Sequence, residues 1–227
     1  MESIQFKKKV ILILLLAGVI NSSAQEIILI DFGPNDVVNG NVTNVIDVNG
    51  DYWNNMTDSK SGSQIVLSDI SNNSEGATLK LNISMGKNGI NNGGLLEPSE
   101  EHLGKIAIAT ATQDYFYING DSHASISLVG LDVNKEYRFS IFGSRNTQLA
   151  RESFYAIRGE NISSGILQTS GIPPNNESDL YHGNDTSVFT SQYVNPLKDG
   201  TIDVQVRIEK GGFAYMNAMK IEIKNTK

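Results

Sequence analysis

The chain has 227 residues, of which 18 are Lys or Arg and 25 are Asp or Glu, and it contains no cysteine. The absence of thiols excludes disulfide bonds, thiolate zinc sites and a cysteine nucleophile. Residues 25–227 hold 15 basic against 24 acidic residues, and this negative balance argues against nucleic acid as a partner. A chain of about 200 residues buries roughly 70% of its unfolded surface, so it needs no covalent cross-link to fold.

Residues 1–24 have the three-part pattern of a secretory signal peptide. Three lysines (7–9) precede eleven apolar residues (10–20), and small residues follow, with Ser22 and Ala24 at the −3 and −1 positions before Gln25. Eleven apolar residues are too few for a membrane span, which needs about 20. We therefore expect cleavage after residue 24 and an exported protein, periplasmic or extracellular, without a membrane span in the mature chain. Export without disulfides is more typical of bacteria.

After the leader, the dominant pattern is the alternation of apolar and polar residues, which is typical of half-buried strands. Residues 77–85 and 202–208 show this alternation most clearly. No window of twelve or more residues after Ala24 has sustained helical periodicity. About ten strands are predicted, at 26–32, 63–69, 77–85, 105–110, 124–128, 137–141, 154–158, 187–193, 202–208 and 219–223.

Turn residues separate the predicted strands, as at Asn49-Gly50 and Asn119-Gly120. Segments rich in Asn, Ser and Gly at 35–50, 88–99 and 170–185 are predicted to be long loops. No repeat or Pro/Ser-rich linker divides the chain. We therefore expect an all-β protein, with one two-sheet antiparallel β-sandwich or jelly-roll domain over residues 25–227.

Several short strings suggest a family. They are DFGP at 31–34, NGDYWNN at 49–55, ATQDY at 111–115, GLDVNKEY at 130–137 with FGSR at 142–145, and YMNAM at 215–219. Together they resemble the galactose-binding-domain-like jelly-roll modules of exported bacterial, Bacteroidetes-type proteins, over most of residues 26–224. Such modules are often found beside polysaccharide-degrading enzymes or GDSL-type esterases. The resemblance therefore implies a carbohydrate partner, either a polysaccharide or a glycan.

Candidate ligand-binding residues lie in the predicted rim loops, where a sandwich usually carries its function. Trp53 is followed by Asn54 and Asn55. This combination is typical of a sugar-binding site, because the indole ring stacks on the apolar face of a sugar while the side-chain amides bind its hydroxyl groups. The alternative is that Trp53 plugs one end of the sandwich. Asp114 and Tyr115 have the same two alternatives.

Arg145 and Arg151 bracket a polar loop and could form a clamp for a carboxylate, as in a uronic acid. The alternative is a pair of surface salt bridges. Tyr215 and Asn217 begin the last predicted strand, and they are candidates for the same rim or for packing inside it.

A cation site is a further candidate. Asp31, Asp36 and Glu222 could supply oxygen ligands where the terminal strands meet, and Ca²⁺ takes six to eight such oxygens. The modules that this chain resembles often hold a structural calcium ion. The alternative is that these carboxylates cap a loop. The three histidines do not have the spacing of a metal-binding pair.

One set of residues resembles the catalytic motif of an enzyme. Ser122 in a Gly-Asp-Ser string, with Asp179 and His182 in an Asp-x-x-His string, matches the signature of GDSL-type hydrolases. Those enzymes place the serine after the first strand of an α/β sheet, whereas here it precedes a strand of an all-β chain, so a turn is the favoured interpretation. The leading hypothesis is an exported, non-catalytic carbohydrate-binding module. The alternatives are a secreted polysaccharide hydrolase or lyase, and a structural or adhesive surface protein.

Overall fold

The computed structural model describes residues 26–174 and 180–226. The predicted signal peptide, its cleavage site and Asp179 lie outside the described residues. Fourteen strands are present in the described residues: β1 (Glu26–Phe32), β2 (Asn54–Met56), β3 (Gln64–Ser68), β4 (Ser74–Leu81), β5 (Gly86–Asn88), β6 (Tyr115–Asn119), β7 (His123–Val129), β8 (Lys135–Phe142), β9 (Arg151–Arg158), β10 (Ile162–Ser170), β11 (Phe189–Thr190), β12 (Ile202–Lys210), β13 (Phe213–Met216) and β14 (Ala218–Asn225). The helices are short: η1 (Ile90–Asn92), α1 (Glu100–Leu103), η2 (Gly104–Ile106) and α2 (Ala109–Thr112).

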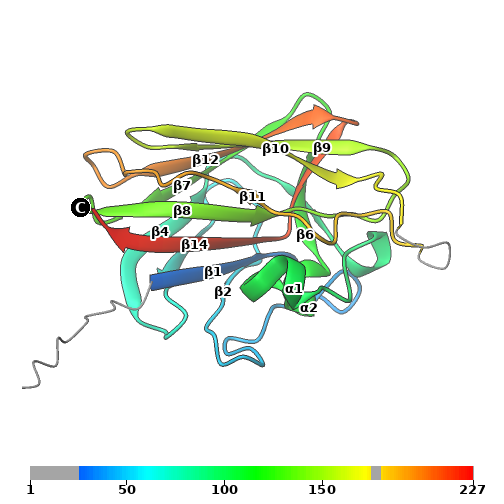
Figure 1. Ribbon diagram of the computed structural model, residues 1–227, viewed down its shortest axis with the longest axis horizontal. Coiled ribbons are helices and arrows are strands. Elements are labelled where there is room, and N and C mark those ends of the chain that lie inside the picture. The colour runs from blue at the N-terminus through cyan, green and yellow to red at the C-terminus, as the bar shows by residue number, and fades with distance from the viewer. Residues whose placement is uncertain (1–25, 175–179, 227) are drawn as a thin grey trace, which may run out of the picture.

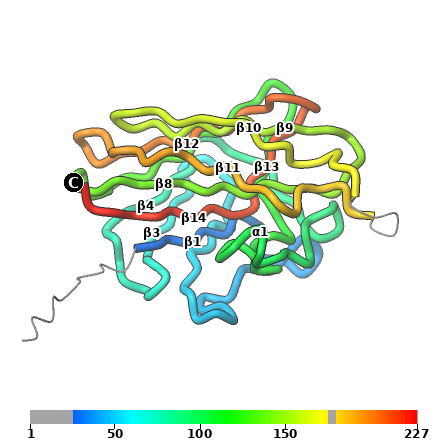
Figure 2. Tube along the Cα trace, in the orientation of Figure 1, coloured from blue at the N-terminus to red at the C-terminus, as the bar shows by residue number. Residues whose placement is uncertain are grey.

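Two large sheets pack face to face, with their strands running along the long axis of the molecule (Figure 1). One has the order β11-β8-β14-β1-β2 and the other the order β10-β9-β12-β7-β4-β3. The chain crosses repeatedly between them, and β1 lies beside β14, so the two terminal strands are neighbours (Figure 2). Only the β1–β2 pair is parallel among the strand pairs of the described chain. The predicted all-β, two-sheet antiparallel sandwich is confirmed, with this one parallel exception.

The main hydrophobic core fills the space between these sheets. Alternate residues of β1, β8 and β14 meet alternate residues of β4, β7 and β12, because side chains of a strand point in turn to its two faces. Representative members are Ile30, Phe139 and Ile221 from one sheet and Leu79, Ile126 and Val204 from the other. The alternation that predicted the strands is therefore the alternation that builds this core.

A second, smaller hydrophobic cluster lies on the other face of the five-stranded sheet. Leu29 of β1 points away from the main core and packs with Trp53, Phe142 and apolar residues of α1, η2 and α2. The helices lie near the end of this sheet in Figure 1. The strand β1 is consequently covered on both faces, which explains why its sequence is apolar almost throughout.

The third sheet has three short strands in the order β13-β6-β5. Phe116 and Ile118 of β6 and Ala214 and Met216 of β13 point inward and belong to the main core. The residues that alternate with them point to the other side of this sheet, where Tyr115 and Tyr215 are buried and Tyr117 and Phe213 are partly exposed.

The predicted strand at 105–110 is wrong, because the structure has η2 and α2 there. The alternation of Ile106 and Ile108 with smaller residues was too short to distinguish a strand from helical turns. Ile106 is buried against the second cluster, while the carbonyl of Ile108 accepts hydrogen bonds from Ala111 and Thr112 and starts a turn of helix. Two other predicted strands are shorter than expected. The strand predicted at 77–85 ends at Leu81, and the strand predicted at 187–193 is reduced to β11.

None of the helices in the described part of the chain is long and apolar enough to cross a membrane.

Candidate functional site

The outward face of the three-stranded sheet carries four aromatic rings. Tyr115 and Tyr117 come from β6, and Phe213 and Tyr215 come from β13. The rings form a continuous set: Tyr115 meets Tyr215 edge to face at 5.2 Å, and the Phe213 and Tyr215 rings are parallel with centroids 6.1 Å apart. Tyr117 and Phe213, 6.0 Å apart, are the two half-exposed members. We call these four residues the aromatic face.

The strand register explains why the rings gather. Tyr117 lies opposite Tyr215 in the antiparallel pair, so residues two apart on either strand share its face. On the other side Tyr117 lies opposite Gly86 of β5. A Cβ atom at Gly86 would lie 2.4 Å from the Tyr117 ring. The glycine therefore gives this ring room to lie over the neighbouring strand.

Two arginines border the aromatic face. Arg145 follows β8 and donates from Nη1 to the Tyr215 hydroxyl at 3.4 Å, and Arg151 at the start of β9 donates from its own Nη1 to the same oxygen. The guanidinium of Arg151 also lies over the Phe213 ring, 4.3 Å from its centroid. The predicted group of Arg145, Arg151, Tyr115 and Tyr215 is thus brought together by the fold. Burial raises the pKa of Tyr115, so its phenol is neutral at physiological pH.

An open pocket lies beside this group. It has a volume of about 490 Å³, and Asn146, the residue after Arg145, contributes to its wall. Asn146 also contacts Gly93 through a backbone hydrogen bond of 2.6 Å, and the hydroxyl of Tyr115 donates to the carbonyl of Asn92. The pocket has both apolar and polar sides and is lined by Ile90, Gly93, Gly94, Leu95, Leu96, Glu97, Asn146, Tyr181 and Asp185.

Trp53 and Asn54 lie elsewhere. The Trp53 side chain is 1% exposed within the second hydrophobic cluster, and its Nε1 donates to Asp47 Oδ2 at 2.9 Å. Asn54 is buried, and its amide bonds the backbone at Leu29 and Ser68. These positions match the packing alternative for Trp53, because neither face of the ring is open to a sugar.

Asn217 is likewise buried and occupied. Its Oδ1 accepts from the Ser144 backbone at 2.8 Å, and its Nδ2 donates to the Thr112 carbonyl at 3.0 Å. The side chain therefore ties the segment after β8 to α2 and to the start of β14. It supports the loop that carries Arg145 without itself reaching the surface.

Two buried carboxyl groups form the other unusual feature of the described chain. Asp114 is 0% exposed, and both its carboxyl oxygens lack a hydrogen-bond partner. Asp31 is also buried, with Oδ2 bonded to the Thr43 amide at 2.9 Å and Oδ1 unpartnered. Burial raises the pKa of Asp31 to about 7. Burial, with the charges of Asp31 and Asp36 added, raises the pKa of Asp114 to about 9.

The carboxyl groups of Asp31 and Asp114 are surrounded by glycine backbone and by the side-chain amide of Asn55. Cβ atoms placed on Gly33, Gly40 and Gly89 would lie 2.1, 2.0 and 2.6 Å from the nearest atom of Asp114, so three backbone segments enclose that side chain. Asn55 lies opposite Asp31 in the β1–β2 pair, and its Oδ1 is also buried and unpartnered. Three side chains from separate segments thus present four unpartnered oxygen atoms: Asp31 Oδ1, Asn55 Oδ1, Asp114 Oδ1 and Asp114 Oδ2.

The other two predicted cation ligands are engaged differently. Asp36 caps its own turn by accepting from Asn39 and Val38, and these hydrogen bonds, led by Asn39, lower the pKa of the Asp36 carboxyl. Glu222 pairs with Arg138 at 2.8 Å. Glu222 is also four residues along β14 from the partner of Asp31, a distance of about 13 Å. Glu222 is therefore too far away to share an ion with Asp31.

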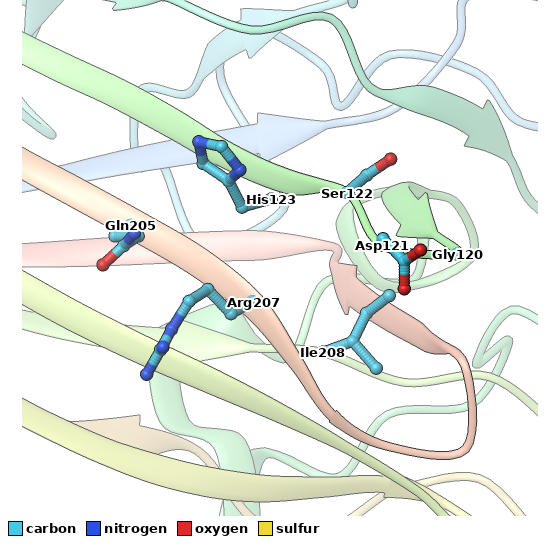
Figure 3. Close-up of a pocket in the computed structure, with 7 residues that line it drawn as sticks. All are labelled: Gly120, Asp121, Ser122, His123, Gln205, Arg207 and Ile208. Atoms are coloured by element: carbon cyan, nitrogen blue, oxygen red, sulfur yellow. The ribbon is translucent and has the colours of Figure 1, made fainter.

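The serine of the Gly-Asp-Ser string lies in a turn before β7 and borders a shallow pocket of about 460 Å³ (Figure 3). In this view the Ser122 hydroxyl points away from His123. His182 does not line the pocket, and its Nδ1 lies 3.2 Å from the carbonyl of Ile172. The turn interpretation of this string therefore agrees with the described residues.

Sequence reasoning missed Tyr117 and Phe213. The signal was present, because Tyr115 and Tyr117, like Phe213 and Tyr215, stand two residues apart and so share a face of any strand. What was not visible was that the two strands would pair.

No family model matches the chain, and no curated protein matches it. Two solved carbohydrate-binding modules match part of the chain. TmCBM61, solved in complex with beta-1,4-galactotriose, is 14% identical over 50% of this chain and 72% of its own, with a TM-score of 0.28. The CBM35 module from Cellvibrio japonicus Abf62 is 12% identical over 66% of this chain and 98% of its own, with a TM-score of 0.33. At these TM-scores the likeness carries no functional argument.

Proposed function

We propose that this protein is an exported, non-catalytic module that binds a polysaccharide or glycan at the aromatic face and the pocket beside it. The observation that supports this most directly is the pair of half-exposed rings, Tyr117 and Phe213, on the outer side of the small sheet. Flat aromatic surfaces stack on the apolar faces of sugars, while nearby amides and guanidinium groups bind hydroxyl groups. Arg145 and Asn146 stand at this edge and supply such donors.

The geometry also favours a preformed surface. The rings are fixed by strand pairing, by Gly86 below Tyr117 and by the stacked guanidinium of Arg151. A rigid aromatic platform loses little conformational freedom when a ligand binds. We therefore expect the affinity of the protein for a sugar chain to depend on the two half-exposed rings.

Tyr117→Ala should weaken binding to a polysaccharide by about 5- to 150-fold, corresponding to about 1–3 kcal/mol for an aromatic contact. Affinity electrophoresis on a panel of soluble plant and algal polysaccharides would identify the ligand, and isothermal titration calorimetry would give the constants. The matched control is Tyr193→Ala, since Tyr193 is also a half-buried tyrosine under cationic groups, but it lies near Arg138 and Lys224. The proposal fails if the wild-type protein binds no member of the panel, or if both variants bind alike.

We further propose that Asp31, Asp114 and Asn55 hold a structural calcium ion. Two carboxylates and an amide oxygen are the hard donors that calcium prefers, and their unpartnered oxygen atoms fit this chemistry. Among the described residues no group of three or more His, Cys, Asp or Glu side chains forms a metal site, so backbone carbonyls or water would complete the shell. The ion would neutralise the buried charge and hold the first loop against the segment before β6.

Calcium at millimolar concentration should raise the melting temperature of the wild-type protein at pH 8, and chelation with EDTA should lower it. Ligand at 100 times its dissociation constant stabilises the folded state by about 2.7 kcal/mol. Magnesium at the same concentration should do less, because it demands a smaller octahedral shell. Asp114→Asn should abolish the calcium response, whereas Glu222→Gln should preserve it. A wild-type melting temperature that ignores both calcium and EDTA would rule out the ion.

A further inference from the structure

The two arginines beside the aromatic face have no acidic partner. Arg145 and Arg151 both donate to the hydroxyl of Tyr215, and neither forms an ion pair in the described chain. Arg151 is only 7% exposed, and the Nε atoms of both arginines are buried without a hydrogen-bond partner. The guanidinium groups of Arg145 and Arg151 therefore lie close together, and each has an Nε–H group without a hydrogen-bond acceptor.

This arrangement differs from the other cations of the structure. Arg138 is paired with Glu222, Lys105 with Asp51 and Lys135 with Glu26. Arg158 and Arg207 have no acid partner either, but both are exposed and so are solvated by water. In a chain with a formal net charge of −7, a partly buried pair of unpaired arginines is the exception.

Burying a cation is costly unless an anion or several hydrogen bonds compensate it. The rings of Phe213 and Tyr215, 4.3 and 5.7 Å from the Arg151 guanidinium carbon, supply part of that compensation through their π faces. They supply no negative charge. An anion that reached this edge would meet two guanidinium groups already in place, although their unpartnered Nε atoms are themselves buried.

We infer that the sugar bound at the aromatic face carries a negatively charged group, and that Arg145 binds this group while the buried charge of Arg151 supports it from behind. This inference rests on the proposed function. The chemistry required is an oxyanion on a sugar ring, either the carboxylate of a uronic acid residue or a sulfate ester, since a guanidinium fork donates two parallel hydrogen bonds to such a group.

The two arginines have different tasks. Arg151 is held in place by its stacking on Phe213 and by Thr169, whose hydroxyl donates to the Arg151 carbonyl. Its charge therefore supports the site from behind. Arg145 is half-buried and stands in the loop after β8, so its guanidinium is the one that meets the ligand. Removal of Arg145 should consequently change ligand preference with little effect on folding.

The test compares short oligosaccharides in which the acidic group is either free or masked or removed, and isothermal titration calorimetry at pH 7 measures their binding. One arm uses oligogalacturonides against their methyl esters, and the other uses sulfated against desulfated galactan oligosaccharides. The expected result is that at least one charged form binds ten times or more tighter than its neutral counterpart. This preference should shrink as sodium chloride rises from about 50 to 500 mM, because salt screens charge. The arm that shows the preference identifies the carboxylate or the sulfate.

The variant Arg145→Gln should reduce this preference about tenfold, because it lowers the affinity for the charged sugar more than the affinity for the neutral one, while the melting temperature stays unchanged. Arg158→Gln is the matched control, because it removes the same charge from an exposed arginine that bonds to Gln205 on the six-stranded sheet, and it should keep the wild-type preference. Equal binding of charged and neutral sugars would overturn the inference and leave the proposed function standing. Binding of no carbohydrate in either arm or in the wider panel would overturn both.

Discussion

Trp53→Ala should lower the free energy of unfolding by about 3–5 kcal/mol, the range for removing a large buried aromatic side chain. The indole is 1% exposed among Leu29, Phe142 and the short helices. The truncation would leave a cavity there, and Asp47 Oδ2 would lose the hydrogen bond that it accepts from Nε1. For a domain of this size the loss corresponds to a fall in melting temperature of roughly 10 °C, which differential scanning calorimetry would measure.

The variant Trp53→Phe separates the cost of the cavity from the cost of losing the hydrogen bond to Asp47. It keeps most of the ring and loses the hydrogen bond to Asp47, so it should cost less, about 1.5–3 kcal/mol for a bond to a charged group. At a temperature where both variants are folded, their affinity for the polysaccharide should equal that of the wild type, because the indole does not contribute to the aromatic face. An alanine variant that melts normally but loses carbohydrate binding would reverse this assignment and return Trp53 to the binding site.

In the absence of divalent cations, the protein should lose stability as the pH rises from about 5 to 8. The pKa of an aspartate in an unfolded chain is about 3.9, whereas burial raises the pKa of Asp31 to about 7 and that of Asp114 to about 9. Between these values the folded state binds more protons than the unfolded state, so the free energy of unfolding falls with pH. The stabilising contribution is complete below about pH 4 and is lost as the pH passes the folded-state values.

The expected slope is about 1.4 kcal/mol per pH unit for each carboxyl that stays protonated only in the folded state. This corresponds to roughly 3–6 °C in melting temperature per pH unit. Thermal melts in EDTA at pH 5, 6, 7 and 8 would measure it. Asp114→Asn replaces a neutral acid by a neutral amide of the same shape, so the variant should match the wild type at pH 5, show a shallower slope and melt higher at pH 8. Parallel curves for the two proteins would mean that Asp114 does not titrate in this range.

The sequence predicted the class of fold because burial on one face of a strand imposes a period of two, and this period is visible locally. The strands β4, β7, β8, β12 and β14 were all recognised from it. The same reasoning failed at residues 105–110, where a few alternating apolar residues fit helical turns equally well. Short strands such as β2 and β5 have too few residues to show any period.

Part of the proposed site was already among the candidates drawn from the sequence. Arg145, Arg151, Tyr115 and Tyr215 were candidates because of their residue types and their places beside predicted strand ends. Their mutual contact could not be read from the chain, because β6 and β13 pair only through the tertiary structure.

What the sequence determined by itself was thus the local pattern: most of the strands, the turn residues and the kinds of side chain that the loops carry. Only the tertiary structure decided which side chains meet and which are buried. It placed Trp53 under the short helices, and it brought Asp31 and Asp114 together in a glycine-lined enclosure. The physical reason is that burial and strand register depend on segments far apart in the chain. A residue's type fixes what it can bind, but its exposure and its neighbours follow from packing.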